Sequence, residues 1–293
     1  MNQAVLITGA SSGIGLHLTK CLAKIGHLVY ATARKESDLQ TLASIENVTA
    51  VQLDVREPDQ IAQAVELVTS QNTGLFGLIN NAGIGGVGFL STWTEEELQE
   101  IIDVNLMGPW RVTNAFLDLL LASKGRVINI GSRGGSITKS LFGPYSMTKF
   151  GLEAYTEALR EELAPHGVYA SIVQPGGVVS EIAEKATPGI LARLDRAQPP
   201  FLEEASAVRK ILTSPPESQA ETSSPEVVFE AVDHALFSDR PKPRYLVGTR
   251  KEGNRVISAF FEKIVQANQQ SQMGYSRDEL IQLLDVHIQS NQQ

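Results

Sequence analysis

Cysteine occurs only once, at Cys21, in a chain of 293 residues. A single thiol excludes a disulfide within the chain and any metal cluster built on several cysteines. We expect Cys21 to act as a small buried apolar side chain in a helix. The five histidines are scattered without the paired spacing of a metal-binding helix, so the sequence predicts no metal site.

Long apolar runs and long basic runs are also missing. No apolar stretch reaches the ~18 residues of a membrane-spanning helix, so we expect no membrane span. The first strand-like segment begins at Ala4 and leaves no room for a secretion signal, which predicts a cytoplasmic protein. The formal net charge of −8 argues against nucleic acid as a partner. An anionic ligand would therefore need a local site.

A glycine-rich turn near the N-terminus is the first motif that is present. Residues 4–8 form a short apolar run, residues 9–15 read Gly-Ala-Ser-Ser-Gly-Ile-Gly, and apolar residues then recur with helical spacing. This order predicts strand, turn and helix. Glycines let a pyrophosphate approach the backbone, and the amides of the helix N-terminus point at its charge. A turn that merely packs tightly is the alternative.

The end of the next predicted strand, 27–33, indicates which dinucleotide binds. In such folds an acid at this place binds the ribose 2′-hydroxyl, whereas an arginine binds a 2′-phosphate. Here Ala33 ends the strand, and Arg34 and Lys35 follow without an acid. The sequence therefore favours NADP(H), although solvated surface charge would also account for both cations.

Apolar runs that alternate with helical patterns indicate the fold class. Further strands are predicted at 47–53, 75–80, 126–131, 168–174 and 244–248. Most are separated by helical patterns, which is typical of a doubly wound parallel α/β sheet with right-handed crossovers. The pattern fades over 178–224, where we expect a mobile segment with one or two short helices. Two amphipathic helices are expected at about 250–269 and 276–289.

Tyr145 and Lys149 are the candidate reactive pair. Apolar or small residues recur after Tyr145 with a helical period, so the two side chains lie four positions apart on one face. A free tyrosine titrates near pH ~10, but a fixed cation beside it lowers the pKa. A decrease of about 3 units needs roughly 4 kcal/mol. Without further context, an exposed surface pair would be the commoner interpretation.

Asn105 falls within a predicted helix that follows an N-cap at Thr94. Asparagine in a helix interior competes with the backbone for hydrogen bonds. Its presence there predicts either a kink or a functional role.

Taken together, these motifs resemble those of the short-chain dehydrogenase/reductase family. The features occur in the family's order and include the typical spacing of thirteen between Ser132 and Tyr145: Thr8-Gly9-x-x-x-Gly13-x-Gly15, Asn80-Asn81-Ala82-Gly83, Asn105, Ser132, Tyr145-x-x-x-Lys149 and Pro175-Gly176. The resemblance is strong over about 1–182. A weaker similarity at 225–248 looks like the hydroxysteroid and retinol dehydrogenase branch.

The resemblance implies a Rossmann-type doubly wound parallel sheet of about seven strands in the order 3-2-1-4-5-6-7. Helices would cover both faces, and a C-terminal helical extension would follow. We expect one oxidoreductase domain over 1–248, which includes the mobile substrate-loop segment 178–224. The extension, 249–293, has no role that the family supplies.

The resemblance also implies a role for each catalytic residue. Tyr145 would protonate the carbonyl oxygen as hydride arrives from the nicotinamide, or act as the base in oxidation. Lys149 would bind the nicotinamide ribose and lower the pKa of the tyrosine. Ser132 would hydrogen-bond the substrate oxygen where charge develops. Asn105 would hold a water that connects Lys149 to solvent.

The implied cofactor site collects residues from the ends of several strands. Asp54 and Val55 would flank the adenine, and Asn81 would lie on the adenosine ribose side. Ser180 stands where the family usually has a threonine near the nicotinamide carboxamide, so it keeps the hydroxyl without the methyl. The full set is Gly9, Ser11, Ser12, Gly13, Ile14, Gly15, Arg34, Lys35, Asp54, Val55, Asn81, Ala82, Gly83, Tyr145, Lys149, Pro175, Gly176, Val178 and Ser180.

The expected function is that of an NADP(H)-dependent oxidoreductase that interconverts a ketone or aldehyde and an alcohol. The alternatives are a 3-oxoacyl-thioester reductase and a nucleotide-binding sensor or scaffold without turnover. The substrate would be a lipophilic small molecule such as a steroid, retinoid or aromatic ketone, because the residues expected around the cleft are mostly apolar: Phe89, Leu141, Phe142, Ile182 and Phe201. Packing within a lid would equally account for these side chains.

Small residues on the Tyr155 helix, Gly151, Ala154 and Ala158, allow close packing against another helix. In the family this helix often forms a subunit interface. The sequence therefore predicts a homo-oligomer, either a homodimer or a homotetramer.

Overall fold

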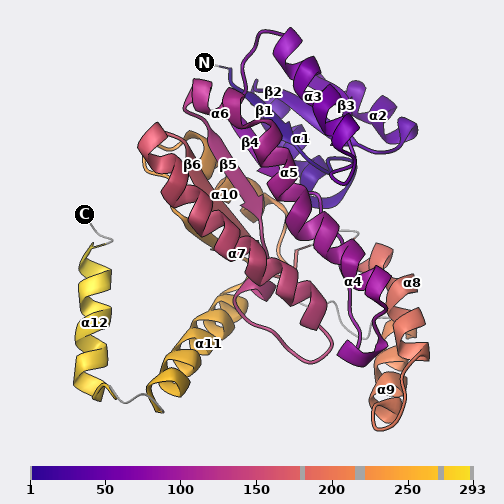
Figure 1. The fold of residues 1–293 in the computed structure, drawn as a ribbon, viewed down its shortest axis with the longest axis vertical. Coiled ribbons are helices and arrows are strands. Elements are labelled where there is room, and N and C mark those ends of the chain that lie inside the picture. The colour runs from indigo at the N-terminus through magenta and orange to yellow at the C-terminus, as the bar shows by residue number, and fades with distance from the viewer. Residues whose placement is uncertain (1, 179–181, 215–221, 270–273, 291–293) are drawn as a thin grey trace.

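A computed structural model describes residues 2–178, 182–214, 222–269 and 274–290. Seven parallel strands form one sheet in the order β3-β2-β1-β4-β5-β6-β7 (Figure 1). The strands are β1 (Ala4–Ile7), β2 (Leu28–Ala33), β3 (Val48–Gln52), β4 (Gly77–Asn80), β5 (Arg126–Ile130), β6 (Tyr169–Pro175) and β7 (Arg244–Val247). The predicted doubly wound sheet is confirmed, including its strand order.

Helices cover both faces of the sheet and create two separate cores. One face packs against α3 (Pro58–Ser70), α5 (Gly108–Ala115), α6 (Leu117–Ser123) and α7 (Gly143–Leu163), and the other against α1 (Gly13–Lys24), α2 (Glu36–Ala43) and α10 (Glu226–Phe237). Because strand side chains alternate, Leu6 faces the first core and Ile7 the second, and both are fully buried. This double burial explains why the strands read as short apolar runs.

Thr94 begins α4 (Glu95–Ile102) with the predicted N-cap. Its hydroxyl accepts a hydrogen bond of 3.2 Å from the Glu97 amide, and the Glu97 carboxylate accepts one of 3.0 Å from the Thr94 amide. The helix then widens into a π-helical turn, Asp103–Met107, which contains Asn105. The sequence predicted a kink or a functional role at Asn105, and the structure places a π-helical turn there.

Segment 178–224 contains two helices, α8 (Ile182–Asp195) and α9 (Leu202–Thr213), which are longer than the short helices that we predicted. They enclose a third, smaller core. Phe89 and Phe201 stack there with ring centroids 4.7 Å apart, and Leu141 packs against the same core. We expected these three residues at a substrate cleft. They instead pack beneath α8 and α9, because the apolar side of α8 is buried against them.

Two helices form the C-terminal part, α11 (Arg250–Gln269) and α12 (Arg277–Ser290), close to the predicted bounds. Figure 1 shows α11 leading outward from the body of the molecule and α12 lying apart from the sheet. Ser276 and Glu279 form the predicted capping box before α12, with hydrogen bonds of 2.7 and 3.3 Å. Among the described helices, none combines the length and the apolar character that crossing a bilayer requires.

Candidate active site

The predicted cofactor residues follow the carboxyl ends of β1, β2, β3, β4 and β6, which lie at one edge of the parallel sheet. Gly9 has φ +63°, and a Cβ on it would lie 2.9 Å from the Cα of Ala82. A Cβ on Gly15 would lie 2.4 Å from the Gly9 carbonyl oxygen. Close packing therefore requires both glycines. It also brings the turn after β1 against the loop after β4, which creates a backbone cradle at the N-terminus of α1.

Thr8 and Asn81 lock these two loops together. The Asn81 side-chain amide donates to the carbonyl oxygens of Thr8 and Gly9, both at 2.9 Å. The Thr8 hydroxyl accepts from the backbone amides of Asn81 and Ala82 at 2.9 and 3.0 Å. Asn81 thus uses its amide hydrogens to position the turn, which leaves its carbonyl oxygen for the predicted ribose contact. Thr8 is a site-forming residue that belonged to the motif but had no predicted role.

A cluster of cations lies at the ends of β2 and β3. The side chain of Arg34 is 62% exposed, and its Nη1 lies 3.7 Å from the Asp54 carboxylate. Arg56 donates two hydrogen bonds to the same carboxylate, from Nη2 at 2.8 Å and from Nε at 3.1 Å. The hydrogen bonds from Arg56 hold the pKa of Asp54 below its usual value. Sequence reasoning missed Arg56, although it stands only two residues after Asp54.

Ser132, Tyr145 and Lys149 come together where β5 ends and α7 begins. The Ser132 hydroxyl accepts a 3.0 Å hydrogen bond from the Gly134 amide. The Lys149 Nζ lies 5.9 Å from the centre of the Tyr145 ring, so the predicted neighbourhood is confirmed. Burial lowers the pKa of Lys149 to about 8, although the charge of Glu153 one turn further opposes this change.

The pKa of Tyr145 differs from the prediction in its direction. Burial raises it above the ordinary value, and this outweighs a hydrogen bond with Ser132 and the charge of Arg133, which both lower it. The expectation that Lys149 gives the phenol a low pKa is therefore wrong for the chain by itself. The physical reason is desolvation, which disfavours a phenolate in this half-buried position.

Asn105 holds the loop after β4 through side-chain hydrogen bonds. Its side chain donates to the Ile84 carbonyl oxygen at 2.9 Å, accepts from the Ile84 amide at 2.8 Å and donates to Thr148 at 3.2 Å. A Cβ on the neighbouring Gly83 would lie 3.3 Å from Asn105 and 3.9 Å from the Lys149 Nζ. Asn105 thus holds the loop after β4 close to Lys149. The water relay stays a prediction.

A line of buried polar side chains, linked by hydrogen bonds, connects the strands next to the site with the helices that cover them. Asn80 donates to Thr113 at 2.9 Å and to Asn129 at 2.8 Å, and Asn129 donates to Thr156 at 2.8 Å. The line joins β4 and β5 to α5 and α7, so it fixes how the strand ends meet α7. Asn80 belonged to the Asn80-Asn81-Ala82-Gly83 motif, whereas Asn129, an asparagine within an apolar strand, had no role in our prediction.

Pro175 is the last residue of β6, one residue beyond the predicted strand end, and Gly176 and Val178 follow it. The Gly176 amide donates to the Val247 carbonyl oxygen at 2.8 Å, and Val178 makes a parallel bridge with Ser223. Ser180 falls outside the described residues.

Cys21, in α1, is half-buried, whereas we expected it to be buried. It lies 3.5 Å from His17, which in turn is 3.1 Å from Glu226, and the three potential ligand atoms lie within 4.8 Å of one another.

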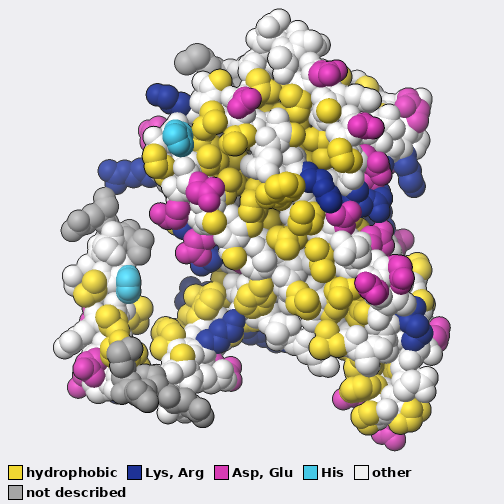
Figure 2. Space-filling view, viewed as in Figure 1, with side chains coloured by type: hydrophobic (Ala, Val, Ile, Leu, Met, Phe, Trp, Pro, Cys, Tyr) yellow, Lys and Arg dark blue, Asp and Glu magenta, His cyan; other side chains and the backbone are white. Residues whose placement is uncertain are grey.

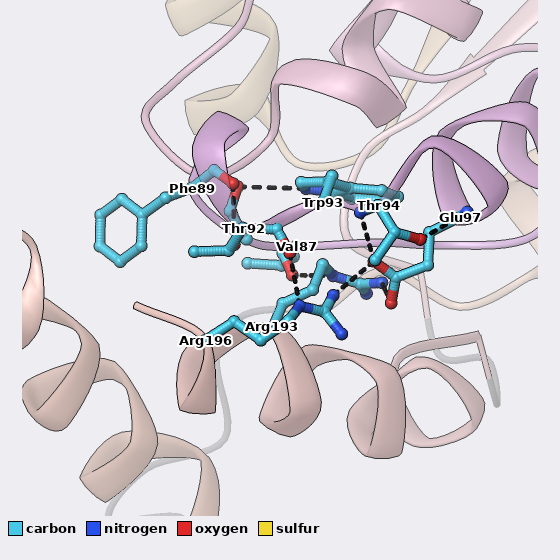
Figure 3. Close-up of polar contacts among 9 residues, drawn as sticks. Val87, Phe89, Thr92, Trp93, Thr94, Glu97, Arg193 and Arg196 are labelled. Atoms are coloured by element: carbon cyan, nitrogen blue, oxygen red, sulfur yellow. Dashed lines mark hydrogen bonds and ion pairs between the residues drawn. The ribbon is translucent and has the colours of Figure 1, made fainter. Parts of the chain in front are cut away.

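Helix α8 is fixed to the loop after β4 by Arg193, as Figure 3 shows. Its Nε donates to the Val87 carbonyl oxygen at 2.9 Å, and its Nη1 lies 3.2 Å from the Glu97 carboxylate. The guanidinium also stacks 4.0 Å from the Trp93 ring. Arg193 is only 5% exposed, so this charge depends on its partners.

Further contacts hold α8 at both ends. Arg196 donates to the Thr92 carbonyl oxygen at 2.8 Å and to Glu97 at 2.5 Å (Figure 3). Near the start of the helix, the Lys185 Nζ donates to the Ser12 hydroxyl at 2.6 Å. Helix α8 therefore spans the site edge from the glycine turn to α4.

Comparisons with known proteins agree with this arrangement. A model of the short chain dehydrogenase family matches residues 3–190. The chain belongs to the short-chain dehydrogenase family. This short-chain dehydrogenase is 36% identical over 268 residues to the mitochondrial D-beta-hydroxybutyrate dehydrogenase of Bos taurus, which covers 83% of this chain and 76% of that protein.

Two other similar proteins extend the comparison. Retinol dehydrogenase 5 of Mus musculus is 36% identical over 263 residues, 83% of this chain and 80% of that protein, which agrees with the predicted branch. A serine dehydrogenase complexed with NADP+ has a TM-score of 0.72 and 26% identity, and covers 85% of this chain and 96% of its own. The chain is thus an oxidoreductase with a nucleotide-binding Rossmann fold. Its predicted cytoplasmic location stays a prediction, since the bovine relative is named as mitochondrial.

Proposed function

We propose that this short-chain dehydrogenase interconverts a ketone or aldehyde and an alcohol with NADP(H). The observation that carries the proposal is the meeting of Ser132, Tyr145 and Lys149 at the sheet edge, beside the backbone cradle of Gly9 and Ala82. Bound nicotinamide dinucleotide supplies or accepts the hydride. Tyr145 gives its phenolic proton to the carbonyl oxygen in reduction and takes it back in oxidation. Ser132 hydrogen-bonds the same oxygen.

The protonated phenol of Tyr145 is suited to act as an acid. Since burial raises the pKa of its phenol, the group holds its proton at neutral pH and can donate it to a carbonyl oxygen. The oxidative direction needs the phenolate and so becomes faster as pH rises. Lys149 is the nearby cation, and because its own pKa is about 8, it loses its charge as the pH rises above that value.

The cations of the site support NADP(H). The exposed Arg34 guanidinium is available for a 2′-phosphate, and Arg56 holds the Asp54 carboxylate that would otherwise repel that phosphate. In a chain with a net charge of −8, such local cations are needed to bind an anionic ligand. The NADP+ complex of a similar serine dehydrogenase is in line with this choice.

The pyrophosphate is expected at the N-terminus of α1. The Gly9–Gly15 turn contains no Lys or Arg, and the Ser12 N-cap makes no side-chain capping bond. The amides of the first helical turn and the Lys185 ammonium, which reaches Ser12, are then the groups that meet its charge. Lys185 thus joins the proposed cofactor site.

The proposed substrate is lipophilic. Phe142 and Ile182 are 42% and 41% exposed, and the first residues of α8 lie over the loop after β4, because a Cβ on Gly85 would meet Ile182 at 3.4 Å. Similarity to retinol dehydrogenase 5 also favours a lipophilic alcohol.

Three apolar side chains are exposed on α5 and α7: Trp110, Met147 and Phe150. They support the proposed homo-oligomer, and Figure 2 shows apolar side chains gathered over this part of the surface.

The direct test is NADPH consumption with a panel of ketones and aldehydes. We expect oxidation of NADPH with lipophilic members of the panel. Tyr145→Phe should abolish turnover while NADPH still binds. Tight NADPH binding with no oxidation over the whole panel, unchanged in Tyr145→Phe, would identify a sensor instead of an enzyme.

A further inference from the structure

We propose that Glu252, in the C-terminal helix α11, is a positioning residue that aligns the loops after β5 and β6, so that the chain beyond residue 248 is part of the catalytic unit. The effect on turnover rests on the proposed function, whereas the effect on ligand binding can be measured independently of it.

Glu252 joins three loops at the carboxyl edge of the sheet. It is only 7% exposed. One carboxylate oxygen accepts a 2.7 Å hydrogen bond from the Gly177 amide, after β6, and pairs with Arg133, after β5. The other accepts from the Thr249 amide at 3.1 Å, after β7. A single carboxylate therefore connects the residue next to Ser132 with the Pro175-Gly176-Gly177 loop.

The glycines around Glu252 make room for its carboxylate. A Cβ on Gly176 would lie 2.2 Å from the Glu252 Oε2, and one on Gly248 would lie 2.7 Å from the same atom. Gly248 also has φ +145°, which disfavours other residues. Gly176 of the Pro175-Gly176 motif therefore leaves room for the Glu252 side chain of α11, in addition to its expected role beside a ligand.

Charge holds the arrangement together. Burial tends to raise the pKa of Glu252, but hydrogen bonds from Gly177 and Thr249 and the charge of Arg133 outweigh it and lower the pKa below its ordinary value. The carboxylate is therefore ionised at neutral pH. A buried carboxylate with these partners resists displacement, so it holds the Arg133 guanidinium close to the Gly177 amide.

A second contact from α11 reaches the same loop after β5. The Lys263 Nζ donates to the Ser136 carbonyl oxygen at 2.7 Å and lies 4.7 Å from the Phe150 ring. Helix α11 thus touches the segment 132–136 near its start and again three turns later. Figure 1 shows α11 starting beside the sheet before it leads outward. Both contacts hold the segment that carries Ser132.

The experiment compares Glu252→Gln with wild type in binding and in turnover. The glutamine keeps the size of the side chain but places an NH₂ group against the donors of Arg133 or Thr249. Dissociation constants are measured for NADPH and for adenosine 2′,5′-bisphosphate, which lacks the nicotinamide half. We expect about tenfold weaker NADPH binding, an unchanged bisphosphate affinity, and a kcat that falls by about tenfold or more with the best ketone.

Two further variants keep the test decisive. Arg133→Gln removes the opposite partner of the ion pair and should reproduce the selective loss of NADPH affinity, even if Glu252→Gln folds poorly. Glu262→Gln changes an exposed acid on the same helix and should behave as wild type.

Two results would overturn the proposal. One is wild-type NADPH affinity and kcat in folded Glu252→Gln. The other is an equal loss of affinity for NADPH and for the bisphosphate, since that would indicate general damage to the fold. A failure of the proposed function would look different, because wild type itself would not oxidise NADPH.

Discussion

The ammonium of Lys149 donates a 2.9 Å hydrogen bond to the carbonyl oxygen of Ile130, the last residue of β5. Ser132 follows two residues later, so the same stretch of backbone positions the serine and the lysine of the site. Asn105 and Gly83 approach from the neighbouring loop. The catalytic groups are therefore held by rigid strand ends rather than by their helix alone, which keeps their geometry fixed.

Removal of Arg34 should change which nucleotide binds. Because its exposed guanidinium is expected at a 2′-phosphate, Arg34→Ala should weaken NADPH binding by about tenfold or more and leave NADH binding almost unchanged. Fluorescence titration with both nucleotides measures the ratio. Lys20→Ala, another exposed cation, serves as the control. Equal effects on NADPH and NADH would mean that the 2′-phosphate lies elsewhere.

Lys185→Gln should give a different pattern. Its ammonium lies at the Ser12 hydroxyl, where the pyrophosphate common to NADPH and NADH is expected. Both dinucleotides should bind about tenfold more weakly, whereas adenosine 2′-monophosphate, which lacks the 5′-phosphate and so any part of the pyrophosphate, should bind as before. Calorimetric titration of the three ligands measures this, with Lys210→Gln on α9 as the control. Unchanged NADPH and NADH affinities would remove Lys185 from the cofactor site.

Lys149 should make stability depend on pH. Its pKa in the folded chain is about 8, below the value of 10.5 for an unperturbed lysine. Between these values the unfolded chain binds more protons, so this lysine makes the free energy of unfolding rise with pH, by roughly 3 kcal/mol in all. Below pH ~8 the charged side chain destabilises the fold by its full burial cost.

Urea unfolding of wild type and Lys149→Met at several pH values measures this contribution. The stability advantage of Lys149→Met should be largest below pH ~8 and shrink as the pH rises to about 10.5. Lys251→Met, at an exposed position, should follow wild type throughout. A constant difference between wild type and Lys149→Met would show that Lys149 titrates as an exposed lysine.

Glu97 should control the docking of α8. It pairs with both Arg193 and Arg196. Glu97→Gln keeps an oxygen that can cap α4 but removes the charge opposite two guanidinium groups. Because Arg193 is buried, its unpaired charge should weaken the docking by about 1–3 kcal/mol. Hydrogen exchange should then be faster in α8 and α9 and unchanged in α1.

Glu96→Gln, in the same turn, is the matched control and should leave the exchange of α8 unchanged. If α8 and α9 exchange at the wild-type rate in Glu97→Gln, the apolar core of Phe89, Ile190 and Leu194 holds these helices without the ion pairs.

Local patterns in the sequence predicted the parts of the structure that depend on neighbouring residues. The N-cap at Thr94 and the bounds of α11 are confirmed because capping chemistry and helical periodicity act over a few residues. The strand order is also confirmed, but it was implied by the resemblance to a family and not by a local pattern. The site motif also placed Tyr145 beside Lys149 correctly, since helical spacing alone brings them together.

Contacts between distant segments could not be predicted in the same way. Glu252 meets Gly177 across 75 residues, and Arg193 meets Glu97 across 96. Nothing local marks such partners. The direction of the Tyr145 pKa failed for a related reason: it depends on how much water the folded chain removes, and the lysine one turn away is only part of that environment.

The most direct measurement follows deuterium from the nicotinamide C4 of NADPH into the alcohol product, in wild type and in Tyr145→Phe. The proposed chemistry predicts that wild type delivers the deuterium to the carbinol carbon. Tyr145→Phe should bind NADPH with the same affinity but form almost no labelled alcohol. Equal transfer in both proteins would contradict the role of Tyr145 as the proton donor.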